Sequence, residues 1–510
     1  MLDRVDGPAM RRWADVATAA LADARAEIDA LNVFPVPDSD TGTNLFLTLA
    51  QAREAVFRGP ADAPLVAVGE AFARGALRGA RGNSGVIVSQ YLDGLVTAFQ
   101  AESLEAADGA ALARALDVAQ RAARLAVGRP VDGTILSVAR AAAEAADHAA
   151  DDGGPLAEVT LAALVAARRS LAHTPQELEV LRRAGVVDAG ARGLVVMLEA
   201  LHAVVTGQEL MPGALSDLSA VPDPEIDHAM LPFATSGGAF EVMFVVEGTG
   251  GADLAPELRS RMAGLGDSVG VVGGRGVWQV HVHTDAPVHA ITAGALGRQH
   301  QVCVRHLESH AATQRAGHPD RGLVVATSAP NLAADLARMG AVVLVLTADG
   351  AATPGEFLRA VADAGATDVV VLAGSEAARD AATRSAEQLP PARPGVPQPH
   401  VHVLDATTDV QVVAGVAAYC EAGSTIDAVR ATVAGMRTAH LDAAGLAAAA
   451  DTAARLLGAD GELLTVLRGA GVDPRTVDDL ADALATSHPG VELIALDGGQ
   501  ARCALELGVG

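Results

Sequence analysis

The sequence contains no lysine, so all 37 of its basic residues are arginine. This absence excludes a catalytic Schiff-base lysine and a phosphate-binding loop of the GK[ST] type, because both need an ε-amino group. Aromatic residues make up only 3% of the chain, although half of the chain is hydrophobic. The cores must therefore be built from Ala, Val and Leu, which suit closely packed helices and buried strands.

Cysteine is also scarce. Cys303, Cys420 and Cys503 lie far apart and without metal-ligand spacing, which favours a reducing compartment over a disulfide framework. The first residues show no apolar signal region, and no window reaches the ~18 uncharged apolar residues of a membrane span. We expect a cytoplasmic protein with no integral membrane segment.

The formal net charge of −25 repels phosphate backbones and anionic lipid surfaces. Nucleic acid is therefore not expected as a partner, and solubility is the simple explanation of the charge.

A chain of 510 residues exceeds the size of a single core, and its composition changes in three places. Residues 1–206 have a helical period almost throughout, with Ala-rich stretches at 110–127, 135–150 and 157–172. Short β-rich runs at 240–248 and 269–285 predict a small α/β middle domain over 236–307. Strands alternate with helices over 322–510, which predicts a parallel or mixed α/β sheet. Linkers are predicted at 207–235 and 308–321, and a proline-rich loop at 388–399.

The stretch LNVFPVPDSDTGTNL, residues 31–45, places two carboxylates on a proline-stiffened turn before a helical pattern. In a tight turn, Asp38 and Asp40 can converge on a hard cation such as Mg²⁺. Thr41, Thr43 and Asn44 then offer polar groups at a helix N-terminus, where amides and the helix dipole favour phosphate. The alternative is an ordinary turn in which Asp40 or Thr41 caps the next helix.

A second turn, GARGNSGVIVSQ from residue 79, leads from one helical pattern into another. Its polar part could form a backbone nest for an anion. The alternative is a plain helix–helix turn with Gly82 as C-cap and Ser84 as N-cap. The nest would consist of Gly82, Asn83, Ser84 and Gly85.

These two turns, with RPVDGTILSVA (129–139) and TPQELEVLRRAGVVDAGARGL (174–194), resemble motifs of the bacterial fatty acid kinase catalytic subunit. That family's nucleotide-binding domain is related to the L subunit of dihydroxyacetone kinase, which implies an all-α helical barrel. The resemblance continues through residues 265–287 of the middle domain and 463–500 at the C-terminal end, so it covers effectively the whole chain.

The resemblance implies an ATP-dependent kinase that phosphorylates a fatty acid carboxylate presented by a separate acyl-binding protein. Asp38 and Asp40 would hold Mg²⁺ on the ATP phosphates, Thr43 and Asn44 would contact phosphate or metal, and Gly82–Gly85 would cradle the phosphates. Thr134 and the turn from Asp188 to Gly190 would line the nucleotide pocket. The C-terminal domain would recruit the acyl-binding partner.

The chain departs from the family pattern at two positions of the first turn. Ser39 stands where the family usually has glycine, and a positive φ there would cost about 1 kcal/mol. The dihydroxyacetone kinase subunit uses a third aspartate shortly upstream, whereas the nearest side chain here is Asn32. Arg81 is the nearest arginine that could supply positive charge, although a solvated arginine at a helix end is the simpler expectation.

The middle domain contains a candidate zinc site. His281 and His283 alternate on a strand-like run and would point to one face, as two ligands of Zn²⁺ do. In the family these histidines pair with a cysteine, and the alignment puts Glu241 in its place. Either the zinc site survives with the glutamate or the metal has been lost. His400 and His402 repeat the spacing but are expected to be structural.

Three hypotheses remain open: the catalytic chain of a fatty acid kinase, a kinase of a small hydroxyl substrate such as dihydroxyacetone, and a non-catalytic nucleotide-binding regulatory or scaffold protein. Apolar strands in the middle domain make a homodimer plausible.

Overall fold

The computed structural model describes residues 1–510 except for positions 36, 38, 209–237, 249–250, 275, 311–319, 348–349, 390–397, 444 and 459–460. Most of both predicted linkers and of the proline-rich loop lie outside the described residues. The chain forms two compact units. One comprises Met1–Gly237 with Val246–His283, and the other comprises Gly238–Val245 with Thr284–Gly510.

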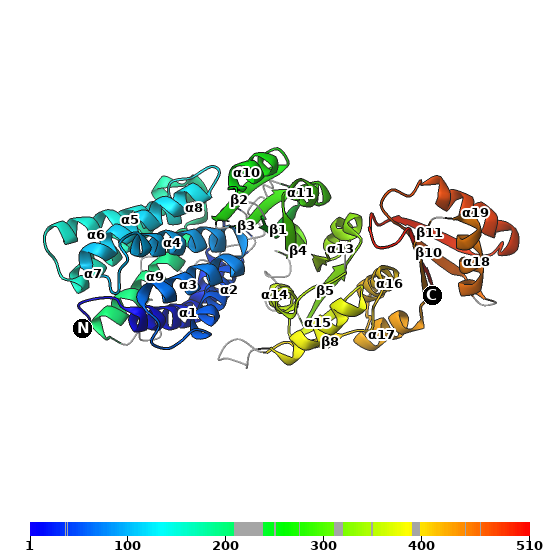
Figure 1. The fold of residues 1–510 in the computed structure, drawn as a ribbon, viewed down its shortest axis with the longest axis horizontal. Helices are drawn as coiled ribbons and strands as arrows, with labels where there is room; N and C mark the ends of the chain where they lie inside the picture. The colour runs from blue at the N-terminus through cyan, green and yellow to red at the C-terminus, as the bar shows by residue number, and fades with distance from the viewer. Residues whose placement is uncertain are drawn as a thin grey trace. The chain divides into compact units, whose positions relative to one another are not determined.

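The first unit is mainly helical (Figure 1). The three Ala-rich stretches predicted as helices correspond to its fifth, sixth and seventh helices. It also contains strand β2 and nearly all of β3, which are neighbours in one sheet. Its helices and strands are α1 (Gly7–Ala30), α2 (Thr41–Phe57), α3 (Leu65–Gly79), α4 (Gly82–Ala101), α5 (Gly109–Ala126), α6 (Ile135–Asp151), α7 (Leu156–Glu177), α8 (Glu179–Ala184), α9 (Ala189–Thr206), α10 (Ala255–Ala263), β2 (Gly266–Gly274) and β3 (Val277–Thr284).

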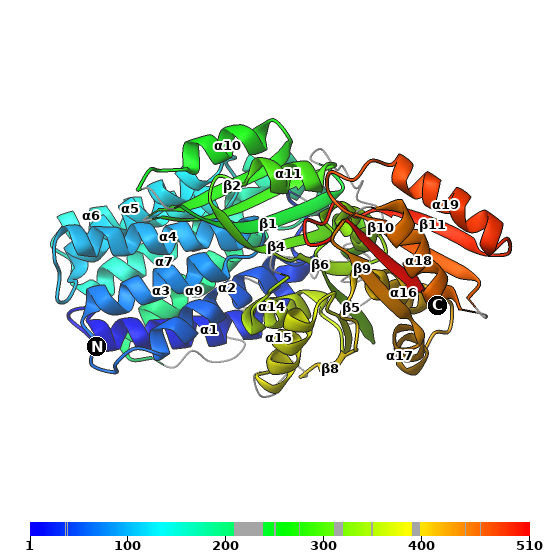
Figure 2. The ribbon, with the colours of Figure 1, turned by 45° about the vertical axis from the view of Figure 1, so that its right-hand side comes forward.

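The long helices of this unit lie side by side, as Figures 1 and 2 show. From α1 to α7 each helix packs on the next, and α9 packs on both α7 and α1, so the series of contacts closes on itself. The core holds the small side chains that the composition predicts, around a few aromatic rings such as Trp13 and Phe72. The helical domain is thus observed, while the barrel implied by the family stays a prediction.

Helix α9 is the central element of the helical unit. It is long and apolar enough to cross a membrane, yet 89% of it is buried inside the protein. It runs antiparallel to α1: the Trp13 indole donates to the Met197 carbonyl at 2.9 Å, and the Leu2 amide donates to the Val205 carbonyl at 2.7 Å. Because of this direction, the N-terminus of α9 lies beside the C-terminal end of α1.

The second unit is α/β, as the alternation of strands and helices predicts. Its larger sheet runs in the order β1-β4-β6-β5-β7-β8 and its smaller one in the order β11-β10-β12-β9. The elements are β1 (Phe240–Glu247), α11 (Pro287–Ala293), β4 (Arg298–His306), β5 (Arg321–Thr327), η1 (Pro330–Leu332), α13 (Ala333–Arg338), β6 (Ala341–Val345), α14 (Pro354–Ala364), β7 (Asp368–Leu372), α15 (Glu376–Glu387), β8 (His400–Val403), α16 (Asp409–Cys420), α17 (Ile426–Gly435), β9 (Arg437–Leu441), α18 (Leu446–Leu457), β10 (Leu463–Arg468), α19 (Arg475–Ser487), β11 (Glu492–Asp497) and β12 (Leu505–Val509).

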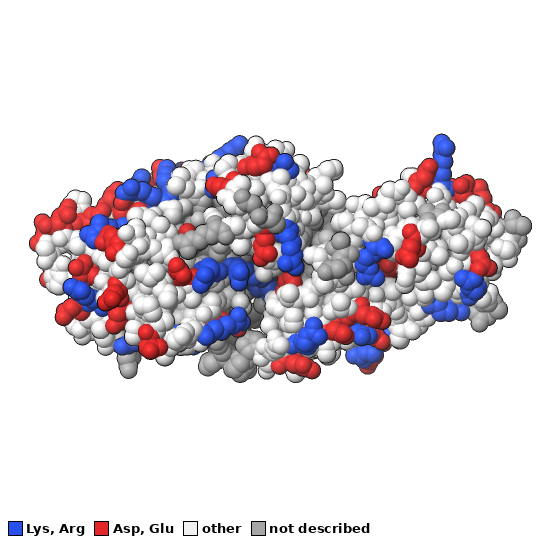
Figure 3. Space-filling model, viewed as in Figure 1, with Lys and Arg blue, Asp and Glu red and all other residues white. Residues whose placement is uncertain are grey.

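The larger sheet is mixed. Strand β5 pairs in parallel with β6 and β7, β7 pairs in parallel with β8, and β4 pairs antiparallel with β6. His402 lies on β8 and bonds Asp368 of β7 at 2.9 Å, which agrees with the structural role expected for it. On the visible face of the molecule, the described Arg and acidic side chains are mixed and form no broad basic surface (Figure 3).

Candidate functional site

The two turns singled out in the sequence lie against each other. Gly82 has a φ of 53°, and a Cβ atom there would lie 2.4 Å from Nδ2 of Asn44. One turn further along, the Thr48 hydroxyl accepts a hydrogen bond from the Arg81 amide at 3.2 Å and lies beside Gly85. Helices α2 and α4 therefore start together, and the positive φ at position 82 favours glycine there.

A single buried carboxylate joins the starts of helices α6 and α9. Oδ2 of Asp188 accepts hydrogen bonds from the Ile135 amide at 3.0 Å and from the Ala191 amide at 2.8 Å. The amide of Asp188 in turn donates to the Thr174 hydroxyl at 3.1 Å. The Asp188 side chain thus fixes two helix N-termini to each other.

Both pairs of helix starts lie at the same end of the helical unit. Arg192, in the first turns of α9, donates to Glu27 near the end of α1 at 2.8 Å. Gly193 of α9 lies against Leu45 of α2. The N-termini of α2, α4, α6 and α9 therefore gather at one end, and each adds partial positive charge and backbone donors suited to an anion.

Asp40 differs from the other aspartates that precede helices in this unit. Asp6, Asp108 and Asp188 are the N-cap residues of α1, α5 and α9, and each side chain accepts an amide of its own helix. Asp40 is the N-cap residue of α2, but its side chain makes no such bond. Its ψ is 1°, whereas N-cap residues usually have an extended backbone. The simpler explanation of this turn, with Asp40 as an ordinary cap, is therefore wrong.

The cap of α2 comes from a residue that the sequence analysis missed. Asp29, in the last turn of α1, accepts the Thr43 amide at 2.9 Å and the Thr43 hydroxyl at 2.7 Å. The pKa of Asp29 is raised from 3.8 to about 6, chiefly by burial and to a smaller extent by the charge of Asp40, while the hydrogen bonds from Thr43 lower it. The sequence contains one signal for Asp29, since a carboxylate in the last turn of a helix opposes the helix dipole and needs another partner.

The remaining predicted residues of the first turn lie as follows. Asp38 lies outside the described residues. Ser39 adopts a φ of 55°. Its backbone therefore has the positive φ for which a conformational cost of about 1 kcal/mol is expected. Thr41 and Asn44 are buried at the start of α2. Asn32, considered as the third ligand, follows the end of α1 and is only 2% exposed.

The predicted residues around the other helix starts serve partly as caps. Thr134 is the N-cap residue of α6, and its hydroxyl donates to the Val131 carbonyl at 2.8 Å. Gly190 lies close to the Asp188 carboxylate. Asn83 and Ser84 are half-buried in the first turn of α4. The N-cap residue of that helix is Arg81, whose side chain does not cap it.

Arg81 corrects one expectation. The sequence favoured a solvated arginine at a helix end, but Arg81 is only 4% exposed. The hydrogen bond from the Arg81 amide to the Thr48 hydroxyl holds the Arg81 backbone against α2. The side chain therefore extends from a backbone position inside the helical unit. A buried guanidinium therefore lies at the start of α4.

The middle-domain residues predicted to bind zinc, Glu241, His281 and His283, are all buried. Glu241 belongs to the second compact unit, and the two histidines belong to the first. The two imidazole rings are 4.9 Å apart between centroids. Oε2 of Glu241 accepts a hydrogen bond from Nε of Arg305 at 2.6 Å. Two imidazoles and a carboxylate suit Zn²⁺, and a ligating carboxylate is commonly held by such a second donor.

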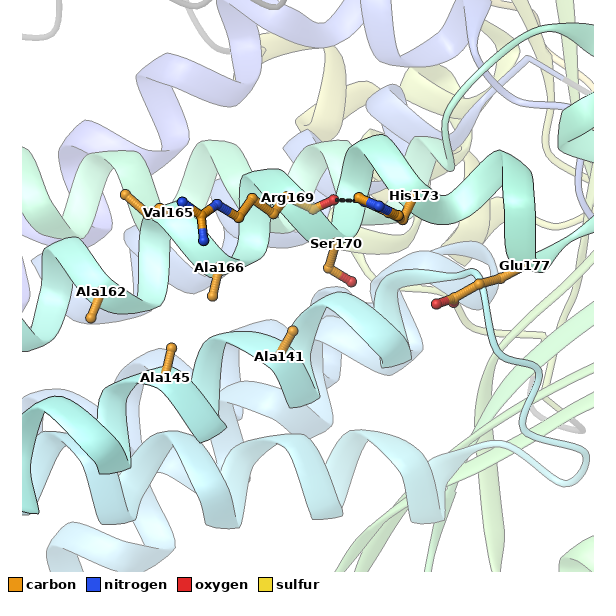
Figure 4. Close-up of a pocket in the computed structure, with 9 residues that line it drawn as sticks. All are labelled: Ala141, Ala145, Ala162, Val165, Ala166, Arg169, Ser170, His173 and Glu177. Atoms are coloured by element: carbon orange, nitrogen blue, oxygen red, sulfur yellow. Dashed lines mark hydrogen bonds between the residues drawn. The ribbon is translucent and has the colours of Figure 1, made fainter.

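A groove of about 510 Å³ runs between α6 and α7, outside the predicted site (Figure 4). Small side chains such as Ala141 and Ala166 line it, and Ser170, His173 and Glu177 lie toward one end. None of the predicted site residues lines this groove. Its alanine lining alone indicates no ligand.

Three family models match the chain in order along its length. The DAK2 domain matches residues 35–203. The middle domain of the FakA-like fatty acid kinase proteins matches residues 238–314, and the C-terminal domain of the same proteins matches residues 433–510.

Relatives in two staphylococcal species match about half of the chain. An uncharacterized protein of Staphylococcus aureus is 36% identical over 264 residues, 51% of this chain and 48% of that protein. An uncharacterized protein of Staphylococcus haemolyticus is 35% identical over 271 residues, 52% of this chain and 49% of that protein. The match thus spans about half the length of these curated relatives.

Two solved structures are similar at low identity. The dihydroxyacetone kinase of C. freundii has a TM-score of 0.31 and 18% identity, over 38% of this chain and 34% of that chain. A DegV family protein from Thermus thermophilus, described for its fatty acid binding, has a TM-score of 0.29 and 15% identity, over 37% of this chain and 99% of that chain.

The helical unit and the first match define a protein with a DAK2 domain, a kinase-family domain. The middle and C-terminal matches follow it in order, so the chain carries a DAK2 domain followed by regions similar to the middle and C-terminal domains of the FakA-like fatty acid kinase proteins.

Replacing Asp188 by Asn tests the role of its buried carboxylate. Burial raises the pKa of Asp188 from 3.8 to about 6, so the folded protein binds this proton more tightly than the unfolded chain. The aspartate's contribution to the free energy of unfolding therefore falls as the pH rises from about 4 to 6. Asn keeps an oxygen for both amides and has no charge to bury. We expect the stability of Asp188→Asn relative to the unaltered chain to rise by about 2–3 kcal/mol over this range.

Denaturant unfolding at pH 4, 5, 6 and 7 measures this difference. Asp108→Asn, which changes the exposed N-cap of α5, is the matched control. A difference between Asp188→Asn and the unaltered chain that stays constant with pH would contradict the assignment.

Proposed function

We propose that the chain is the catalytic component of an ATP-dependent fatty acid kinase. The proposal depends on one observation at the start of α2: the side chain of its N-cap residue, Asp40, makes no cap hydrogen bond. Three aspartates at equivalent positions cap their helices, whereas Asp40 does not and lies where α2 and α4 begin together. A carboxylate held next to two helix N-termini suits a cation bound to phosphate.

In this proposal Asp40, together with Asp38, holds Mg²⁺ on the ATP phosphates. The ion, when bound, neutralises phosphate charge and orients the γ-phosphoryl group. The first turns of α2 and α4 supply backbone donors, including those of Gly82, Asn83 and Ser84. The buried guanidinium of Arg81 offsets the remaining negative charge, a role that lysine cannot fill in a chain that has none.

The acceptor is the carboxylate of a fatty acid presented by an acyl-binding protein. One of its oxygens forms a bond to the γ-phosphorus, the bond from that phosphorus to the bridging oxygen breaks, and acyl phosphate and ADP result. A fatty acid carboxylate is already ionised near neutral pH, so this acceptor needs no general base.

Turnover by the purified chain with Mg²⁺, ATP and a long-chain fatty acid tests the proposal. ADP and hydroxylamine-trapped acyl phosphate are measured with and without an acyl-binding protein. We expect turnover that depends on that protein and that falls about 100-fold or more in Asp40→Asn, because charge stabilisation at the phosphates is lost. Asp62→Asn, which changes an exposed loop carboxylate, should leave the rate unchanged.

Two outcomes would favour the other hypotheses. Turnover on dihydroxyacetone without an acyl-binding protein would favour a small-molecule kinase. Tight Mg²⁺-dependent ATP binding without any turnover would favour a regulatory protein or scaffold.

We further propose that Glu241, His281 and His283 hold Zn²⁺ in the middle domain. Because Arg305 engages Oε2 of Glu241, the metal would bind through the other carboxylate oxygen. Elemental analysis of the purified chain should find about one zinc ion per chain. The double variant His281→Ala, His283→Ala should lose it, while His289→Ala on α11 should keep it. Absence of zinc after purification from zinc-supplied cells would show that Arg305 has replaced the metal as the partner of Glu241.

A further inference from the structure

The carboxylate of Asp29 ties the end of α1 to the start of α2. Both of its oxygens are used at one residue: Oδ1 accepts the Thr43 amide at 2.9 Å and Oδ2 accepts the Thr43 hydroxyl at 2.7 Å. Two hydrogen bonds to one charged group fix direction as well as distance. Asp29 therefore determines both where the first turn of α2 lies and how it is rotated.

The backbones of α1 and α2 also approach closely at this point. A Cβ atom at Gly42 would lie 2.3 Å from the Arg25 carbonyl oxygen and 3.0 Å from Oδ1 of Asp29. Only glycine allows this approach. Gly42 therefore lies in direct contact with α1, and the start of α2 has little freedom to shift.

Asp29 performs the task that an N-cap side chain usually performs. An N-cap oxygen ordinarily accepts the amide of the second or third helical residue, and its loss costs about 1 kcal/mol. Thr43 is the third residue of α2, and its amide is bonded to Asp29. Asp40 is in position to cap, since its carbonyl accepts the Asn44 amide at 2.8 Å, but its side chain makes no cap bond.

We infer that Asp29 is the positioning residue of the site: it caps α2 in place of Asp40, so that the Asp40 carboxylate is not needed as the cap of its own helix and can act on the cation. The inference rests on the proposed magnesium and nucleotide site. Without Asp29, the Asp40 side chain would be drawn to the vacant Thr43 amide, and the two roles would compete. Asp29 itself contacts neither metal nor nucleotide and acts through Thr43 and Asp40.

Mg²⁺-dependent binding of ADP to the full chain, measured by titration calorimetry, tests the inference without any acceptor or partner. We expect Asp29→Ala to weaken binding about tenfold, the loss expected when hydrogen bonds to a charged group are removed. Asp29→Asn keeps an oxygen for the Thr43 amide and should recover most of the affinity. Asp23→Ala, an exposed change on the same helix, should bind as the unaltered chain does.

Failure of this inference is distinguishable from failure of the proposed function. If the unaltered chain does not bind Mg²⁺ and ADP, the proposed function is wrong. If it binds and Asp29→Ala binds equally well, the positioning role is wrong. A purely structural role would lower the melting temperature of Asp29→Ala while leaving the affinity of the folded protein unchanged, and that result would also overturn the inference.

A second variant covers the case in which Asp29→Ala does not fold. Thr43→Val has nearly the same shape and removes only the hydroxyl donor. If Asp29 acts through Thr43, the combination of Thr43→Val with Asp29→Asn should weaken binding no more than the stronger of the two single changes. Fully additive losses would contradict this coupling.

Discussion

Four helices begin at the same end of the helical unit, and this electrostatic constraint shapes everything around it. Each N-terminus carries roughly half a positive charge and several amides without helical partners. Such ends pack together only where hydrogen-bond acceptors satisfy these amides. One oxygen of Asp188 accepts hydrogen bonds from amides of both α6 and α9, and Asp29 accepts one from an amide of α2. Asp188 and Asp29 therefore hold helix starts together, while Asp40 is the aspartate used in the proposed chemistry.

The chain contains no lysine, which limits the side chains that can place positive charge in this region. Positive side-chain charge in the region must come from arginine, whose guanidinium is more weakly hydrated than an ammonium group and is easier to bury. Arg81 and Arg192 are both almost fully buried. Arg192 is held by Glu27, and its neighbour Glu199 is paired with Arg168, so charges inside the helical unit form a connected network. In the proposed site, backbone amides and buried arginine would together take the place of the lysine-containing loop that other nucleotide-binding proteins use.

Sequence periodicity and turn composition predicted the helical first unit, several strands of the larger sheet and the two turns at the site. Ser39 even has the positive φ that the comparison with a family glycine suggested. Asp29 was missed because its partner, Thr43, is 14 residues away and meets it only through the packing of α1 on α2. Arg81 was expected in solvent because its burial depends on Thr48, 33 residues earlier. A sequence pattern indicates which residues belong to one helix, but it does not indicate which helix ends will meet.

Among the described helices, two acidic helix starts differ in which side chains cap them. At α16, Thr408 caps the Gln411 amide, Glu506 of β12 accepts the Val410 amide at 2.8 Å, and Asp409 is bonded to Thr327. That start is acidic and buried, yet protein groups satisfy it, so its carboxylates are structural. At α2 the cap comes from a distant helix, and the adjacent aspartate makes no cap bond to its own helix. The proposed ligand site therefore lies at an acidic helix start whose capping side chain comes from another helix, since Asp29 caps α2 in place of Asp40.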